Sequence, residues 1–190
     1  ISLSNNDDGG SYADTDSTTG NTVLGYLAGQ NIDADSNANT FIGHAVCSAT
    51  PSNTRWNVGV GANTLKAITQ GDANVAVGYK SLTAITTGMR NISVGYGTLA
   101  TADGVEADNV AIGYNAMNDV NHDGAINNVI IGSYAGDEIG TNAFANSVVI
   151  GYAAISSVAT SAASGAVAVG YQSLKGLTSG ASNTAIGYNA

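Results

Sequence analysis

The sequence predicts an all-β fold, a parallel β-solenoid or β-roll of about ten coils of 17–19 residues each. A six-residue string, Asn-Thr/Val-small-Ile/Val-Gly-Tyr, recurs ten times, and its glycine is present in every copy. The unit is too short for a propeller blade, which needs about 40 residues, and its Gly, Asn, Thr and Val are poor helix formers. The copies begin at Asn21, Asn39, Asn57, Asn74, Asn91, Asn109, Asn128, Ser147, Ala166 and Asn183.

Each copy predicts one short strand. Counted from the Asn as position 1, position 2 is always β-branched and position 4 is always a large aliphatic residue, so positions 2, 4 and 6 share one face of a strand. Further apolar residues recur at positions 9 and 12, and Thr-Thr-Gly or related turns close several units. We expect coils stacked in register about 4.8 Å apart, with ladders of Asn amides and a thin core of aliphatic side chains.

Positions 3 and 5 carry small residues, such as Ala76 and Gly78. We expect the 2/4/6 face to fill the coil and this small-residue face to point outward. Small residues let another backbone approach closely, and a thin coil gains burial by self-association, so the small-residue face predicts a contact with other chains. The alternative is that the small residues fit a tight turn within one coil.

The chain divides into two regions. Residues 1–20 are polar and acidic without a complete repeat, and we interpret them as a connection or the end of a preceding coil. Residues 21–190 form the ten-coil repeat domain, which stops inside a motif and is expected to be a fragment of a longer fibre.

Composition excludes several classes of function. The net charge is −9, and the only basic residues are Arg55, Lys66, Lys80, Arg90 and Lys175, so we expect no nucleic-acid partner. No apolar run approaches the roughly 18 residues of a membrane span, so we expect no membrane insertion. Cys47 cannot form an internal disulfide, and at position 9 it is expected to be a buried small hydrophobe.

Catalytic chemistry is not indicated, and we expect no enzyme. His44 stands where most copies have Tyr, so we interpret it as a substituted ladder residue. A glycosidase needs a spaced pair of carboxylates, whereas the aspartates lie in turns and the only glutamates are Glu106 and Glu138.

Two segments are candidate binding sites. Asp119, Asn121 and Asp123, followed by Gly124, match the first half of a calcium loop. The twelfth position is Ile130, which has no carboxylate, and an acidic turn between coils is the alternative. No other cofactor is expected.

Arg55 and Trp56 form the second candidate site. They lie in the turn that contains the only proline, where a Trp beside a cation could stack on a sugar or a peptide. The alternative is that Trp56 covers the edge of a core. Phe144, in another longer turn, is equally ambiguous.

The strings NTAIGYNA at residues 183–190, NVAVGYKSL at 74–82 and NVAIGYNAM at 109–117 resemble the repeats of bacteriophage tail fibres. They are also similar to the head repeats of trimeric autotransporter adhesins. The resemblance implies a homotrimer on a virion tail fibre or a bacterial or extracellular surface, which displays or forms a surface for a host glycan or protein receptor. The longer period here favours the tail-fibre variant and leaves handedness open. The alternative is a monomeric ice-binding or polysaccharide-acting solenoid.

Overall fold

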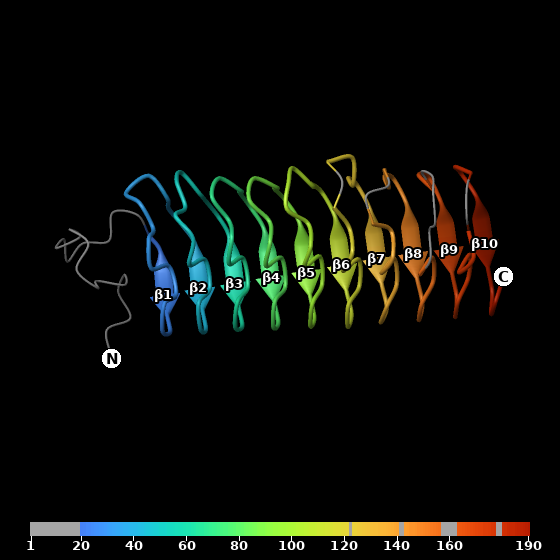
Figure 1. Cartoon of the computed structure of the whole chain (residues 1–190), viewed down its shortest axis with the longest axis horizontal. Helices are drawn as coiled ribbons and strands as arrows, with labels where there is room; N and C mark the ends of the chain where they lie inside the picture. The colour runs from blue at the N-terminus through green and yellow to red at the C-terminus, as the bar shows by residue number, and fades with distance from the viewer. Residues whose placement is uncertain (1–19, 122, 141–142, 157–162, 178–179) are drawn as a thin grey trace.

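A computed structural model describes residues 20–121, 123–140, 143–156, 163–177 and 180–190. They form a rod of stacked coils with one short strand in each (Figure 1). The predicted connection, apart from Gly20, lies outside the described residues. The strands are β1 (Thr22–Leu24), β2 (Thr40–Ile42), β3 (Val58–Val60), β4 (Val75–Val77), β5 (Ile92–Val94), β6 (Val110–Ile112), β7 (Val129–Ile131), β8 (Val148–Ile150), β9 (Val167–Val169) and β10 (Thr184–Ile186).

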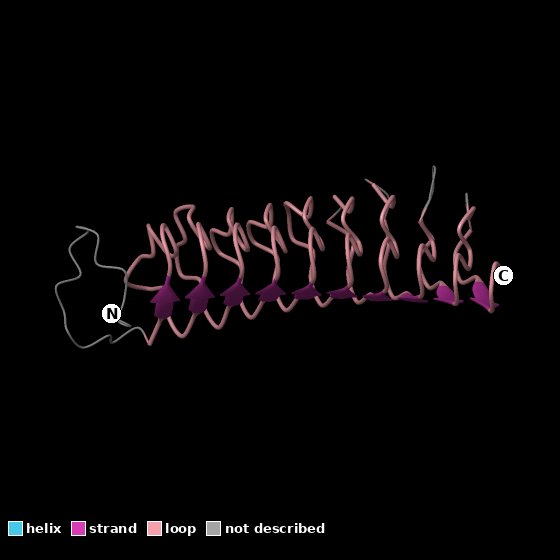
Figure 2. Ribbon diagram, turned by 90° about the horizontal axis from the view of Figure 1, so that it is seen from below, coloured by secondary structure: helices cyan, strands magenta, loops and turns pink. Residues whose placement is uncertain are grey.

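The strands make a single ten-stranded parallel sheet in sequence order, and equal repeat positions pair throughout. Val75 lies beside Ile92 and Ala76 beside Ser93, for example. This register confirms the predicted parallel solenoid. The sheet runs along one side of the rod, and the rest of each coil lies on the other side (Figure 2).

The core lies between the sheet and the opposite wall of the coils. Leu82 and Leu99 at position 9 and Ile68 and Ile85 at position 12 are fully buried. Cys47 is fully buried too, as its place in the repeat predicts. The apolar residues that follow each strand therefore form the wall that faces the sheet.

The prediction of which strand face is inward was wrong. In nine of the ten strands the middle residue, at position 3, is buried while its two neighbours are partly or largely exposed. Phe41, Ala76 and Ile130 have no exposed surface. The small residues therefore face the core, because the coil is thin and the large residues of positions 9 and 12 fill most of its interior.

Residue volumes compensate across this interior. Where position 9 holds Leu65, position 3 is Gly59, and a Cβ on Gly59 would lie 3.3 Å from Leu65 Cδ1 and 2.6 Å from Val46 Cγ1. Where position 3 is the larger Ile130, position 9 is Gly136, whose added Cβ would lie 3.4 Å from Ile130 Cγ2. Phe41 likewise shares its coil with Cys47 in place of leucine.

The invariant glycine at position 5 allows a close approach between successive coils. Its φ lies between 127° and 140° in every copy, a region that side chains disfavour. From Gly25 to Gly170, an added Cβ would lie 2.1–2.5 Å from the carbonyl oxygen of the equivalent glycine in the next coil. The backbone that approaches is therefore the next coil of the same chain.

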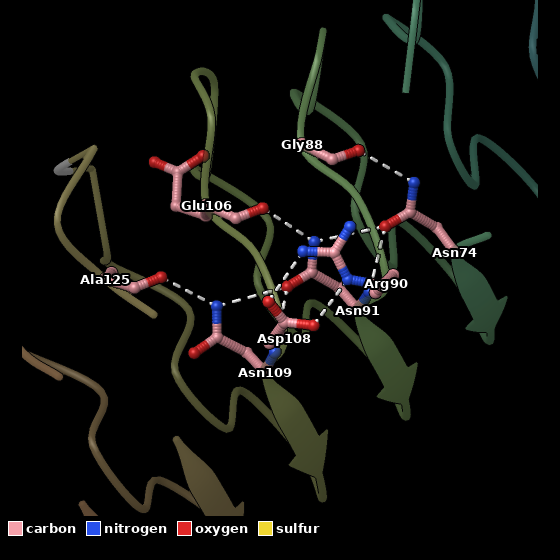
Figure 3. Close-up of polar contacts among 8 residues, drawn as sticks. All are labelled: Asn74, Gly88, Arg90, Asn91, Glu106, Asp108, Asn109 and Ala125. Carbon is pink, nitrogen blue, oxygen red and sulfur yellow. Dashed lines mark hydrogen bonds and ion pairs between the residues drawn. The ribbon is translucent and has the colours of Figure 1, made fainter. Parts of the chain in front are cut away.

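The asparagines form a buried ladder along the rod (Figure 3). Asn91 Nδ2 donates to Asn74 Oδ1 at 3.1 Å and to the Glu106 carbonyl oxygen at 2.8 Å. Asn91 Oδ1 accepts from the backbone N and Nδ2 of Asn109, at 3.2 and 3.1 Å. The predicted amide ladder is confirmed, and Asn91 also bonds to the turn that leads into the next strand, β6.

Candidate functional site

The outward side of the sheet is apolar. We define the aliphatic face as the residues at positions 2 and 4 of the ten strands. Leu24 is 42% exposed, Ile92 41% and Ile186 70%. The face extends over nine inter-strand spacings along the rod and over three residues along each strand, so it measures about 43 by 10 Å. Exposed apolar patches of several hundred Å² mark interaction surfaces.

A row of aromatic rings borders this face, which we call the tyrosine ladder. It comprises Tyr79, Tyr96, Tyr114, Tyr134, Tyr152, Tyr171 and Tyr188, whose successive ring centroids are 4.9–5.9 Å apart. Towards the N-terminus, His44 stacks on Tyr26 at 5.6 Å, which confirms it as a substituted ladder residue. In the stacked pairs the planes differ by at most 29°, so neighbouring rings cover one another's faces.

The ladder changes geometry at Tyr134. In this copy Ser133 takes position 6, and the tyrosine comes one residue later at position 7, where its φ is 57°. The Tyr134 plane is turned by 64° from that of Tyr114 and by 77° from that of Tyr152. Tyr134 therefore meets its neighbours edge to face, and its own ring faces point across the ladder.

A surface groove of about 510 Å³ opens beside Tyr134. Its lining residues are Tyr134, Asp137, Glu138, Tyr152, Ala153, Ser156, Gln172 and Lys175. Burial, with the nearby charges of Glu138 and Asp119, raises the pKa of Asp137 to about 6. The groove thus combines aromatic rings, carboxylates, an amide and an amine. Sequence reasoning missed it, although the displaced tyrosine of this copy was a visible signal.

Arg55 and Trp56 lie directly before Asn57, in the segment that leads into β3. Trp56 has a φ of 58° and is 59% exposed, so it does not cover a core edge. The Arg55 backbone N–H donates to Asp72 Oδ1 at 2.7 Å, and its guanidinium contacts Asn53 Oδ1. The turn fixes Arg55 and leaves the indole accessible, so ligand binding there stays a prediction. Phe144, by contrast, is fully buried.

In the proposed calcium loop, the carboxylates of the two aspartates interact with different acidic residues. The Asp119 charge acts on Asp137, whereas the Asp123 charge acts on Glu106. The Asn121 backbone N–H donates to the Gly140 carbonyl at 3.0 Å, so this segment pairs with the next coil. Within the described ranges no group of three His, Cys, Asp or Glu side chains is placed to hold a metal ion. Calcium binding stays a prediction.

Glu106 is a buried acidic residue that sequence reasoning did not single out for a structural role. It has no exposed surface, and its Oε2 accepts the Gly104 N–H at 3.0 Å while Oε1 has no hydrogen-bond partner. Burial raises its pKa, and the charges of Asp103 and Asp123 add to the rise. Figure 3 shows its carboxyl group directed away from the asparagine ladder.

No helix in the described part of the chain has the length and apolarity of a membrane span. No protein-family model matches the chain, and no curated protein or solved structure matches it either.

Proposed function

We propose that this chain is a segment of a homotrimeric surface fibre, on a virion tail or a bacterial surface, that displays or forms a receptor-binding surface. The observation that carries the proposal is the aliphatic face. It runs the whole length of the rod and exposes large side chains such as Leu24, Ile112 and Ile150. Water contact with so many aliphatic groups costs free energy that association removes.

The length of the face favours copies aligned side by side with parallel axes. A cyclic arrangement closes on itself, so it covers every aliphatic face without growing into a larger aggregate. The resemblance to tail-fibre and adhesin repeats favours three copies. Three linked copies of one weak binding site then bind a surface much more tightly than one copy does.

A monomeric ice-binding solenoid has weaker support. Only Thr22, Thr40 and Thr184 bring a hydroxyl to position 2, and position 4 is aliphatic in all ten strands. A face of this composition favours contact with other apolar groups.

The test is the native mass from light scattering after size exclusion, for the wild type and two charge variants. Val94→Glu places a carboxylate in the middle of the aliphatic face. Gln70→Glu adds the same charge at an exposed turn away from the sheet and is the matched control. Circular dichroism of each variant reports whether the solenoid is still folded.

We expect a three-chain mass for the wild type and Gln70→Glu, and a folded single chain for Val94→Glu. A single-chain mass for the wild type at micromolar concentration overturns the proposal. Ice-crystal shaping by that monomer would then support the alternative. Binding of the labelled trimer to bacterial cells, with loss of binding in Val94→Glu, tests the multivalent display.

A further inference from the structure

We propose that the groove at Tyr134 binds a neutral hexopyranose unit of a surface glycan, with the sugar ring stacked on the Tyr134 face. This inference rests on the display function proposed above, because it names the receptor chemistry that one site on the rod would recognise.

The ring geometry at Tyr134 is the first argument. Tyr96 and Tyr114 are stacked with planes only 10° apart, so their ring normals run along the ladder and their faces cover each other. A ring turned by 64–77° from its neighbours has its normal across the ladder. Tyr134 is only half-buried, so it offers ring surface at the groove.

An aromatic face attracts the C–H face of a sugar. The π-system carries negative charge on its face, and the axial C–H hydrogens of a pyranose carry weak positive charge on an apolar surface. The exposed Tyr152 is a second ring in the lining of the same groove. One hexose contacting both rings would bury apolar area of Tyr134 and Tyr152 together.

The polar lining suits sugar hydroxyl groups. Asp137 and Glu138 supply carboxylate acceptors, and neither has an ion-pair partner within the described residues. Gln172 adds an amide that both donates and accepts. The groove thus places two aromatic rings beside several polar groups, and in small-ligand sites such polar groups fix the orientation of the ligand.

The negative charges around the groove disfavour the binding of acidic sugars. The carboxylates of Asp137 and Glu138 line the groove, and the Asp119 charge reaches Asp137. Lys175 is the single cation in the lining. A uronic or sialic acid would place its own carboxylate among these groups, where like charges repel.

The experiment uses saturation-transfer NMR and titration on the full chain with neutral trisaccharides of glucose, galactose and mannose. Sialyllactose and choline are the acidic and cationic comparisons. Tyr134→Ala removes the ring, and Tyr134→Phe keeps it. Tyr96→Ala is the matched control, because Tyr96 is an exposed ladder tyrosine in the stacked region. Thermal melts of all variants verify folding.

We expect at least one neutral trisaccharide to bind with a Kd in the millimolar range or below, about −4 kcal/mol. Tyr134→Ala should weaken it about tenfold or more, while Tyr134→Phe and Tyr96→Ala stay within about threefold. Asp137→Asn with Glu138→Gln should weaken it as well. No neutral binding at about 10 mM, equal loss in Tyr96→Ala, or preference for sialyllactose or choline each overturns the proposal.

The outcome is separable from that of the fibre proposal. A trimer that binds no neutral sugar supports the fibre proposal and overturns the sugar-binding proposal for the groove. A single chain that binds sugar through Tyr134 overturns the trimer proposal and supports the sugar-binding proposal for the groove.

Discussion

Replacement of Asn91 by alanine tests the asparagine ladder where its bonding is best defined. Asn91 is fully buried, and its side chain makes four hydrogen bonds, two as donor and two as acceptor. In Asn91→Ala, Asn74 Oδ1 still accepts the Asn91 backbone N–H at 3.0 Å. The Glu106 carbonyl and the Asn109 backbone N–H lose the Asn91 partners that they have here.

The expected magnitude follows from these two groups. A buried polar group left without a partner costs about 1–3 kcal/mol, so Asn91→Ala should destabilise this region by about 2–6 kcal/mol. Asn91→Ser should cost less, because a serine oxygen can still accept the next N–H. The chain contains that case already, since Ser147 Oγ accepts the Ala166 N–H at 3.2 Å.

Amide hydrogen exchange is the suitable assay, because a solenoid can open locally without global unfolding. Exchange of the Asn109 amide and of its neighbours in β5 and β6 should accelerate most in Asn91→Ala and less in Asn91→Ser. Asn121→Ala, an exposed asparagine, is the control and should change stability by no more than about 0.5 kcal/mol. An effect of Asn91→Ala no larger than that of the control would refute the reasoning.

Three further predictions concern single side chains. Gly95→Ala puts a Cβ 2.1 Å from the Gly113 carbonyl oxygen at a φ of 139°, so it should lower the free energy of unfolding in urea by about 4 kcal/mol or more. Gly176→Ala is the control, because its Cβ enters open space, and it should lower that free energy by about 0.5 kcal/mol or less. Glu106→Gln should raise the melting temperature at pH 7–8, because the raised pKa of Glu106 means that its ionisation disfavours the folded state. The gain in melting temperature should vanish as the pH falls below the ordinary pKa of 4.5. An equal gain at every pH would contradict this reasoning. Burial raises the pKa of Cys47 to about 12, so a thiol reagent at pH 8 should label it only after denaturation, and rapid labelling of the native chain would contradict its burial.

Repeat periodicity was sufficient to predict the solenoid, its parallel register and the asparagine ladder. Those features depend only on equal residues meeting every 17–19 positions, which the spacing of Asn74, Asn91 and Asn109 displays directly. The inward face could not be read from hydrophobicity alone, because both strand faces are apolar. The usual rule that large apolar residues lie inside fails in a coil this thin, and residues such as Ala76 take the inside instead.

The candidate site was predictable only in part. The repeat predicted that tyrosines would line up, but not that Tyr134 would turn, because ring orientation depends on contacts with the adjacent coils. The approach of Asp119 to Asp137 depends on stacking in the same way. Such sites are made by residues from three coils, so no single segment of sequence contains them.

The ten copies within one chain support the proposal that a partner covers the aliphatic face. Buried position 3 varies from Gly59 to Phe41, because neighbouring positions in the core compensate for its volume. Position 4, which is partly or largely exposed, is Leu, Ile or Val in all ten strands. Folding of a single chain demands little there, since a polar β-branched residue such as threonine also suits a solvent-facing strand. A uniform aliphatic row on the outside is therefore better explained by a second surface that excludes water from it, which the Val94→Glu variant tests directly.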